Sequence, residues 1–324
     1  MNKKIIITGG CGYIGTVVCS FFLKKGFEVI SIDYLKFGNS GLNYLKKFKK
    51  FKNIKDNFDN FKKYNEIFKE FDYVIHLASI SGMPSCAKFK KDSNYINFVA
   101  TKRFFLFLKK KKNIKRIIFA SSTSVFGNKT SVSNERSSCK PISNYGSQKL
   151  NCEKFIMNKL KDKRFIIYRF PTIFGYSPRM RLDLTIHEFA RYIFFNKNFE
   201  VFNLSSVRPY CDINDLSNIL YETIVAKKIF SSQIFCIGSE RYNFSKLDII
   251  NILKKIIKRK KYNYKITNKI DTDKRNYFVS YNNFKNLKIY NFNENPKKKF
   301  SNLVSQIGKL KILDKKKLTS IWYR

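Results

Sequence analysis

Histidine is scarce in this sequence, and its cysteines lack the spacing of a metal or disulfide site. The chain has two histidines, His76 and His187, and seven cysteines, none of which forms a CxxC pair. A His/Cys metal site is therefore not expected, and we predict no bound metal. We interpret the cysteines as reduced thiols, which indicates a cytoplasmic protein rather than a disulfide framework.

Long apolar runs are also missing. The amino terminus, MNKKIII, has only three apolar residues in a row before TGG, which is too short for a signal peptide. The most apolar later stretch, FFLFL at 104–108, is far too short to span a membrane. We expect no targeting segment and no membrane partner.

Acidic residues are few. The 23 Asp and Glu stand against 65 Lys and Arg, which gives a formal net charge of +42. Such a charge can indicate nucleic-acid binding. However, the lysine runs KKFKKFK, KKKK, KRKK and PKKK are scattered along the chain, and Lys, Asn, Ile and Phe are all abundant together. We interpret most of the charge as a solvated surface, or else as a basic surface suited to small anionic substrates, and do not expect nucleic acid as a partner.

Short apolar runs rich in β-branched residues alternate with longer amphipathic stretches. Helices are expected at 12–25, 92–112 and 145–161. The expected strands are KKIIITGG, FEVISIDY, FDYVIHLAS, IKRIIFASS, RFIIYRFPTIFG and QIFCIG. Nearly continuous apolar strands separated by helices predict an α/β fold with a Rossmann-type, doubly wound parallel sheet.

The alternation loosens after RFPTIFG. Residues 176–206 and 239–324 are polar, aromatic and basic, without further regular alternation. We predict a Rossmann domain over residues 1–175, rejoined by 207–238, and a smaller carboxyl-terminal substrate lobe built from 176–206 and 239–324. Ligands would then bind between the two, beyond the carboxyl ends of the strands.

A glycine cluster lies where the first strand should turn into a helix. GGCGYIG contains Gly9, Gly12 and Gly15, and glycines there permit a tight turn and close approach of a pyrophosphate to a helix amino terminus. The spacing is GxxGxxG rather than GxGxxG, but the strand before it and the helix after it are the required context. Asp33 ends the second strand, where a carboxylate can bind the adenosine ribose and repel a 2′-phosphate. The sequence therefore predicts NAD rather than NADP.

Tyr145 and Lys149 are four residues apart in SNYGSQK, just after a serine-rich loop. That spacing is about one helical turn, so the two side chains would share a face. An ammonium beside a phenol favours the phenolate and would bring a pKa of about 10 toward the range of a working base. In a chain rich in Tyr and Lys, an ordinary surface pair is the alternative, and the other motifs decide against it.

Several motifs in order resemble the NAD-dependent epimerase/dehydratase family of extended short-chain dehydrogenases/reductases, which act on nucleotide-activated sugars. TGGCGYIG resembles the family's opening, and SSTSVFG and YGSQK resemble its catalytic serine and Tyr-x-x-x-Lys motifs. KDN at 55–57, HLAS at 76–79 and NFVATK resemble further stretches around the dinucleotide. The resemblance covers nearly the whole chain. It implies cofactor contacts from Gly9, Gly12, Tyr13, Ile14, Gly15, Asp33, Asp56, Asn57, Leu77, Ala78, Asn97, Ser121, Tyr145 and Lys149.

The resemblance also implies the catalytic residues. Tyr145 would exchange a proton with a sugar hydroxyl as hydride passes to or from nicotinamide. Lys149 would lower the pKa of Tyr145 and hydrogen-bond the nicotinamide ribose, and Ser122 would hydrogen-bond the reacting oxygen. Ser121 and Ser124 are less suited to that last role, because neighbouring residues at a strand end point to opposite faces.

The residues after Ser122 favour an epimerase. Family members that eliminate water resemble one another in a carboxylate pair at this place, and those that decarboxylate often carry a glutamate nearby. Here Thr123 and Ser124 follow, and hydroxyls cannot carry protons near neutral pH. The resemblance therefore implies a nucleotide-sugar epimerase. A nucleotide-sugar dehydrogenase, ketoreductase or dehydratase of the same family stays open, as does a non-catalytic NAD- or nucleic-acid-binding protein.

Substrate contacts are implied around the second lobe. In VRPYCDIND, Arg208 matches the family arginine at the nucleotide diphosphate, whereas Asp212 stands where a histidine is common. Thr172 replaces a common asparagine, and YSPRMRLDL adds basic residues in the loop entering the lobe. With Ser122 and Tyr145, the expected substrate contacts are Ser81, Thr172, Arg179 and Arg208.

Similar proteins pair two subunits through the helices near 92–112 and 145–161, so the resemblance implies a homodimer. The nucleotide base, the sugar and the epimerised carbon stay open, because fold and family set the chemistry but not the substrate.

Overall fold

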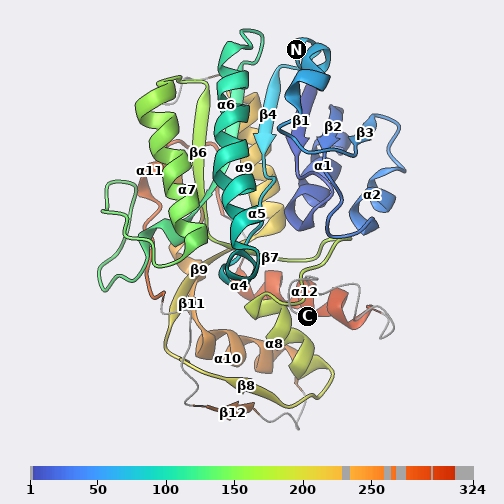
Figure 1. The fold of residues 1–324 in the computed structure, drawn as a ribbon. Helices are drawn as coiled ribbons and strands as arrows, with labels where there is room; N and C mark the ends of the chain where they lie inside the picture. Colours follow the sequence, from blue (N-terminus) through green and yellow to red (C-terminus); the bar gives the residue numbers. More distant parts are fainter. Residues whose placement is uncertain (1–2, 228–233, 259–263, 268–274, 293–294, 311–324) are drawn as a thin grey trace.

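A parallel sheet of seven strands forms the centre of the molecule (Figure 1). The computed structural model describes residues 3–227, 234–258, 264–267, 275–292 and 295–310. The strand order is β10-β6-β5-β4-β1-β2-β3, and all neighbours pair in parallel. The strands are β1 (Lys4–Thr8), β2 (Glu28–Ile32), β3 (Phe51–Ile54), β4 (Tyr73–His76), β5 (Arg116–Ser122), β6 (Phe165–Phe170) and β10 (Ile234–Cys236). The strand order reverses between β1 and β4, where doubly wound sheets bind their ligands. The predicted α/β, Rossmann-type fold is confirmed.

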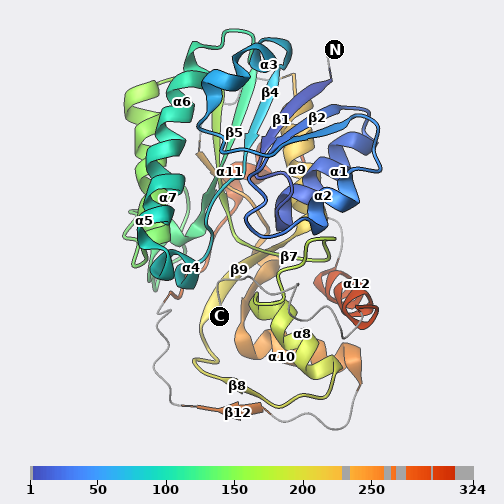
Figure 2. The same ribbon diagram turned by 45° about the vertical axis from the view of Figure 1, so that its right-hand side comes forward.

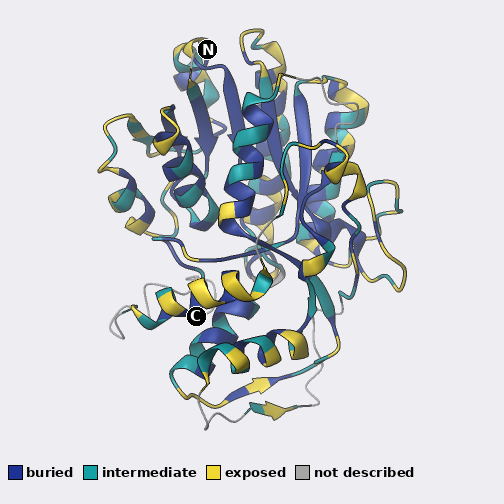
Figure 3. Cartoon of the chain, turned by 180° about the vertical axis from the view of Figure 1, so that it is seen from behind, coloured by how far each residue is buried: buried dark blue, intermediate teal, exposed yellow. Residues whose placement is uncertain are grey.

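Helices cover both faces of this sheet, and Figure 2 shows the sheet lying between them. Ile5 and Ile7 of β1 pack toward α1 and α9, whereas Ile6 packs toward α6 and α7. The strands are therefore apolar on both faces and buried along most of their length (Figure 3). The helices and short turns of this part are α1 (Tyr13–Lys24), α2 (Ser40–Leu45), η1 (Phe61–Tyr64), α3 (Asn65–Glu70), α4 (Met83–Lys88), α5 (Lys90–Asn94), η2 (Tyr95–Ala100), α6 (Thr101–Lys110), η3 (Thr123–Phe126), α7 (Asn144–Phe155), η4 (Ile156–Leu160) and α9 (Ile213–Val225).

The second lobe lies beyond the carboxyl ends of the central strands (Figure 2). It contains a three-stranded sheet in the order β11-β9-β7 and a two-stranded sheet of β12 and β8. Helices α8, α10 and α12 pack against one another. The elements are β7 (Thr172–Phe174), α8 (Thr185–Phe194), β8 (Phe199–Val201), β9 (Val207–Asp212), η5 (Glu240–Tyr242), β11 (Asn243–Ser245), α10 (Lys246–Ile257), β12 (Tyr264–Ile266) and α12 (Pro296–Gly308). Helix α11 (Asn282–Lys285) packs instead against β10 of the central sheet (Figure 1).

Two details differ from the sequence-based expectation. RFIIYRFPTIFG is not one strand: β6 ends before Pro171, which cannot donate to a ladder, and β7 then joins the second-lobe sheet. The carboxyl-terminal part also contains regular amphipathic helices, such as α10, whose buried Ile249, Ile250 and Leu253 lie among lysines that hide the pattern.

We propose the division that the sequence predicts, with 1–175 and 207–238 around the central sheet and 176–206 and 239–324 in the substrate lobe, except that β7 and β9 from the first part join β11 in the second-lobe sheet. The described residues of one hydrophobic cluster extend from β1 to α12, so the two lobes share a core. Within the described ranges, no helix has the length and apolar character needed to cross a membrane.

Candidate active site

The turn between β1 and α1 requires Gly9 and Gly15, two of the three glycines of the predicted motif, for steric reasons. Gly9 has a φ of 70°, and a Cβ there would come within 2.8 Å of the Cα of Ala78. A Cβ on Gly15 would overlap the carbonyl oxygen of Gly9. Gly12 precedes the first residue of α1 with a φ of −74°, which any residue can adopt. The loop therefore brings backbone N–H groups and a helix amino terminus together, as a pyrophosphate site needs.

Asp33 is held at the carboxyl end of β2 by two backbone donors. Its Oδ2 accepts from the N–H of Cys11 at 2.9 Å, and its Oδ1 accepts from the N–H of Leu35 at 2.8 Å. Burial raises the pKa of Asp33, while these two hydrogen bonds and the charge of Arg179 partly offset that rise. A fixed carboxylate one strand away from the glycine loop fits the ribose end of a dinucleotide.

The residues beside the glycine loop form one wall of this cradle. Leu77 and Ala78 follow β4, and the backbone of Ala78 lies directly against Gly9. Tyr13 and Ile14 open α1, where the hydroxyl of Tyr13 donates to the carbonyl of Gly175 at 2.9 Å. The side chain of Tyr13 is therefore bound to the protein, and a cofactor contact would come from its backbone.

Asp56 and Asn57 follow β3 at the same edge of the sheet. The nearby hydroxyl of Tyr64 and further donors lower the pKa of Asp56 to about 2, so its carboxylate is charged at neutral pH. Asn97 is different, because its amide accepts from the N–H of Ile80 at 2.8 Å and donates to Gln148 at 2.8 Å. Asn97 therefore joins the loop after β4 to α7, and its side chain is fully used by the protein.

Tyr145 and Lys149 lie on the first turns of α7, whose start is capped by Ser143. The hydroxyl of Ser143 accepts from the N–H of Gly146 at 3.1 Å. The Nζ of Lys149 is 5.7 Å from the centre of the Tyr145 ring and donates to the carbonyl of Ala120 at 2.8 Å. The predicted helical turn between the two side chains is present, and it faces the carboxyl end of β5.

The pKa of Tyr145 is raised rather than lowered. Burial is the main cause, and Cys86 adds to it. Arg275, Arg181 and the nearby Ser122 lower the pKa, but burial outweighs them. We expected Lys149, one turn away, to lower the pKa of Tyr145, but the net shift of that pKa in the structure is upward.

Lys149 is almost completely buried, at 2% exposure. Burial lowers its pKa to about 8, because the charged ammonium loses water. Its Nζ also lies 4.9 Å from the ring centre of Phe119. The lysine is therefore locked in place beside the end of β5.

The serines of SSTSVFG separate into two environments. Ser121 donates to the carboxylate of Glu153 at 2.5 Å, so its hydroxyl points away from Tyr145. Ser122 and Ser124 have hydroxyl oxygens 3.0 Å apart, and Ser124 accepts from Arg275 at 2.5 Å. We expected Ser124 to point away from the site. The strand ends at Ser122 and the chain turns, so the hydroxyl of Ser124 instead lies beside that of Ser122. Arg275 was not predicted, because no motif surrounds it in the sequence.

Two of the predicted substrate residues lie near this group. Ser81 accepts from Arg181 at 3.1 Å, and Arg181 also forms an ion pair with Asp183. Arg208 lies over the ring of Tyr277 at 5.8 Å. Three arginines from separate segments, Arg181, Arg208 and Arg275, therefore lie near this group.

Thr172 and Arg179 have other surroundings. Thr172 begins β7 and pairs with Tyr210 of β9. Arg179 lies near Asp33 and Phe37, at the end of the site that the cofactor's ribose would occupy.

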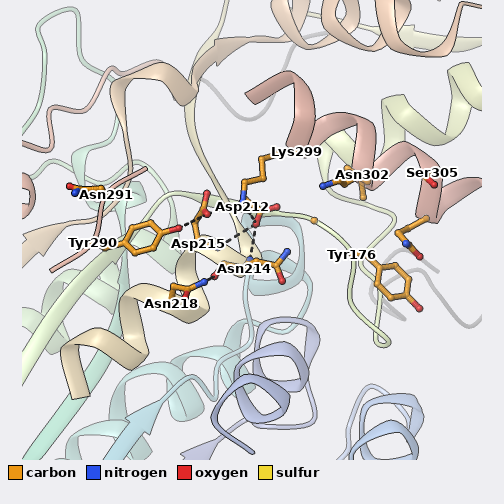
Figure 4. A pocket seen from close by; sticks show the side chains of 13 residues that line it. Tyr176, Asp212, Asn214, Asp215, Asn218, Tyr290, Asn291, Lys299, Asn302 and Ser305 are labelled. Atoms are coloured by element: carbon orange, nitrogen blue, oxygen red, sulfur yellow. Dashed lines mark hydrogen bonds and ion pairs between the residues drawn. The ribbon is translucent and has the colours of Figure 1, made fainter. Parts of the chain in front are cut away.

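Asp212 belongs to a different place. Its carboxylate caps α9 by accepting from the N–H of Asn214 at 2.9 Å, and it lies 3.5 Å from the Nζ of Lys299. Lys299 also pairs with Asp215 at 2.9 Å. These residues line a polar pocket of about 720 Å³ between α9 and α12 (Figure 4). The aspartate that replaces the family's histidine thus has a capping and pairing role.

The sequence model of the NAD dependent epimerase/dehydratase family matches residues 5–238 of this chain. The chain therefore belongs to this family, and the predictions of an enzyme and of NAD as cofactor are confirmed. The glycine loop, Asp33 and the wall at 77–78 fit that dinucleotide.

Named relatives are epimerases and a dehydratase. UDP-glucuronate 4-epimerase of Thermodesulfobacterium geofontis is 28% identical over 268 residues, which are 79% of this chain and 81% of that protein. dTDP-D-glucose 4,6-dehydratase of Dictyostelium discoideum is 26% identical over 276 residues, which are 79% of this chain and 62% of that protein. A solved structure of UDP-glucuronic acid 4-epimerase from Bacillus cereus, in complex with UDP-glucuronic acid and NAD, has a TM-score of 0.84. It is 22% identical and covers 95% of this chain and 100% of that chain.

Proposed function

We propose that this enzyme is a nucleotide-sugar epimerase that works by transient oxidation of a sugar carbon. The observation that carries the proposal is the buried Lys149, whose Nζ lies 5.7 Å from the centre of the Tyr145 ring, with Ser122 close enough to lower the pKa of that phenol. Bound NAD would take up a hydride from the sugar carbon and return it to the other face. Relatives named as UDP-sugar 4-epimerases support UDP-sugars as the first substrates to test.

Each residue of the group has a role that its position supports. Tyr145 would take the proton of a sugar hydroxyl and give it back after the keto sugar has turned. Ser122 would hydrogen-bond the same oxygen and hold it against the phenol. Lys149 would stabilise the phenolate by its charge and hydrogen-bond the nicotinamide ribose. Because burial raises the pKa of Tyr145, positive charge near the phenol is needed to form the phenolate.

The substrate's diphosphate would lie near Arg208 and Arg275. Both guanidiniums are directed to one region: Arg208 lies over Tyr277, and Arg275 reaches Ser124 beside the catalytic serine. Guanidinium groups match phosphate oxygens in geometry and charge. This arrangement would place the sugar between the arginines and Tyr145.

The surroundings of Tyr145 favour epimerisation over dehydration. The hydroxyl of Thr123 lies 3.2 Å from that of Tyr277, and Ser124 is bound by Arg275. Hydroxyls in these two positions cannot supply the acid and base that elimination of water needs. Among the described residues, the formal charges that act most on the pKa of Tyr145 come from Arg275 and Arg181. A dehydrogenase or ketoreductase would use the same residues and is the second candidate.

An assay of the purified protein against a panel of UDP- and dTDP-sugars tests the proposal. Products are identified by mass spectrometry with chromatography, and NADH is followed by absorbance, with and without added NAD. An epimerase converts one sugar into its epimer without net NADH. Stoichiometric NADH production or consumption would establish the dehydrogenase or reductase instead, and loss of 18 Da would establish a dehydratase.

We also propose a homodimer that works in the cytoplasm. Helices α6 and α7 lie side by side, and Leu106 is 45% exposed on α6. A helix pair with exposed apolar side chains can form a four-helix interface with a second copy. The described cysteines are all free, which suits a reducing compartment. Light scattering of the wild type and of Leu106→Glu tests the dimer: the wild type should have twice the monomer mass, and the variant should dissociate.

A further inference from the structure

Arg179 is a buried cation with unusual partners. Its side chain is 3% exposed, and its two terminal nitrogens donate to backbone carbonyls, to Met180 at 2.9 Å and to Phe37 at 3.4 Å. The guanidinium also stacks 5.3 Å from the ring centre of Phe37. Among the described residues, no carboxylate lies within ion-pair distance of it, although Asp33 is near enough to affect its pKa.

The segment that carries Arg179 lies over the glycine loop. The hydroxyl of Ser177 donates to the carbonyl of Tyr13 at 2.8 Å, and the hydroxyl of Tyr13 donates to the carbonyl of Gly175 at 2.9 Å. Figure 2 shows the chain between β7 and α8 extending from the second lobe to the lower ends of α1 and α2. Residues 175–181, which we call the strap, thus connect the substrate lobe to the nucleotide cradle.

A guanidinium in this position lacks a full anionic partner. A buried cation is costly unless a counterion and hydrogen-bond acceptors replace its water. Burial lowers the pKa of Arg179 to about 10, and two carbonyls leave most of its five N–H donors without a strong acceptor. A phosphate group supplies both the charge and the oxygens that a guanidinium fork binds.

The phosphates of the cofactor are the anion that this place fits. Arg179 lies near Asp33, at the ribose end of the cradle, and its backbone N–H donates at 3.2 Å to Ser177, whose hydroxyl binds Tyr13 where α1 begins. A dinucleotide held by the glycine loop on one side would present its phosphate oxygens to the strap on the other. We propose that Arg179 is a cofactor-binding residue, which contacts the phosphates of the dinucleotide, closes the strap over it and slows its release.

This inference moves Arg179 from the sugar nucleotide, where the sequence had suggested it, to the cofactor. It rests on the NAD dependence of the family and not on the proposed epimerase activity, so the two can fail separately. In the proposed epimerase the strap would also have a function. There the cofactor is reoxidised in every turnover and has no need to leave, and the strap would retain it.

Binding of NAD to the whole chain, measured by calorimetry, tests the proposal without any turnover. Arg179→Gln should raise the Kd for NAD about 10- to 100-fold, since a charge-assisted hydrogen bond is lost, and should speed NAD release in a displacement experiment. Arg208→Gln is the matched control, because Arg208 lies at the substrate end, and it should change the Kd for NAD less than about twofold.

Arg179→Lys keeps the charge and guards against a variant that fails to fold. It should bind ADP-ribose and NAD about 3- to 10-fold more weakly than the wild type, because a lysine binds phosphate without the fork, and should bind adenosine equally well. Equal affinities for NAD in the wild type and Arg179→Gln would overturn the proposal. So would an equal loss for adenosine and ADP-ribose in Arg179→Lys, since the contact would then not be with phosphate.

Discussion

The carboxylate of Glu153 accepts a 2.5 Å hydrogen bond from the hydroxyl of Ser121, and both side chains are buried. The same carboxylate forms a 2.7 Å ion pair with Arg169 of β6. Ser121 and Arg169 are paired residues of β5 and β6, so one glutamate on α7 holds both strands.

This bond belongs to a series along α7. Lys149 donates to the carbonyl of Ala120, and Glu153, one turn later, accepts from Ser121. Two successive residues of β5 are therefore bound by side chains from two turns of one helix. Tyr145, one turn before Lys149, is close enough to Ser122 for the serine to lower its pKa. This attachment positions α7 against the end of β5.

Glu153→Gln should lower both stability and activity. The amide keeps the shape but leaves the charge of Arg169 buried without its partner, which costs about 3 kcal/mol of unfolding free energy. A looser α7 should also lower kcat more than it raises KM. Urea unfolding and steady-state kinetics measure the two effects. Ser121→Ala, which removes one hydrogen bond, should cost only about 1 kcal/mol. Full stability in Glu153→Gln would show that the ion pair contributes nothing.

Tyr145→Phe should reduce turnover by about 10²- to 10⁴-fold, because the phenol that moves the proton is lost. NAD affinity should stay within a few-fold of the wild type, since the ring and Lys149 remain. Product formation from the active sugar nucleotide and NAD calorimetry are the measurements. Tyr95→Phe, at a partly exposed tyrosine bound to Asp59, is the control and should retain full activity. A Tyr145→Phe enzyme with a tenth of normal activity would contradict the assigned role.

Gly15→Ala and Gly12→Ala should fail in different ways. The added methyl group at Gly15 meets the backbone of Gly9 and Gly10, so the turn cannot form and the protein should be insoluble or strongly destabilised. At Gly12 an added methyl group would meet only the carbonyl oxygen of Gly9, at 3.2 Å, so the chain should fold. NAD binding should be weakened, because the methyl group would crowd the phosphates held by the turn. Thermal unfolding and NAD titration separate the two outcomes. Equal thermal stability of both variants would refute this difference.

His187 should make the stability of the protein depend on pH. It is fully buried, and burial lowers its pKa to about 4. Between pH 6.5 and 4 the unfolded state binds a proton that the folded state does not, so stability falls as pH falls, by up to about 1.4 kcal/mol per pH unit. His187→Gln should unfold with a correspondingly smaller pH slope over this window, whatever its stability at pH 7. Urea unfolding at pH 7 and pH 5 measures the slopes. An unchanged slope would mean that His187 titrates normally.

Local features of the site were predictable from the sequence. The glycine turn, Asp33 at the end of β2, and Tyr145 one turn before Lys149 depend on spacing within a few residues, and helix and strand geometry converts that spacing directly into position. The same holds for the parallel sheet, because strands buried on both faces must be continuously apolar.

Features that join distant segments were not predictable. Arg275 reaches Ser124 across 151 positions of sequence, and no motif marks it. Ser124 lies beside Ser122 because the strand ends at Ser122 and a tight helical turn, Thr123–Phe126, follows directly. Tyr13 and Asn97 were expected at the cofactor, but their side chains bind Gly175 and Gln148.

The sheet, the nucleotide turn and the Tyr–Lys pair could be predicted from the sequence, since each depends on local periodicity or on a short motif, and several ordered motifs together carried the resemblance to the family. Only the tertiary structure decided the electrostatics of Tyr145, where burial outweighs the charges of Arg275 and Arg181, and the place of Arg179 beside Asp33. Burial and long-range charge interactions depend on which distant segments the fold brings together, and the order of residues alone does not reveal this.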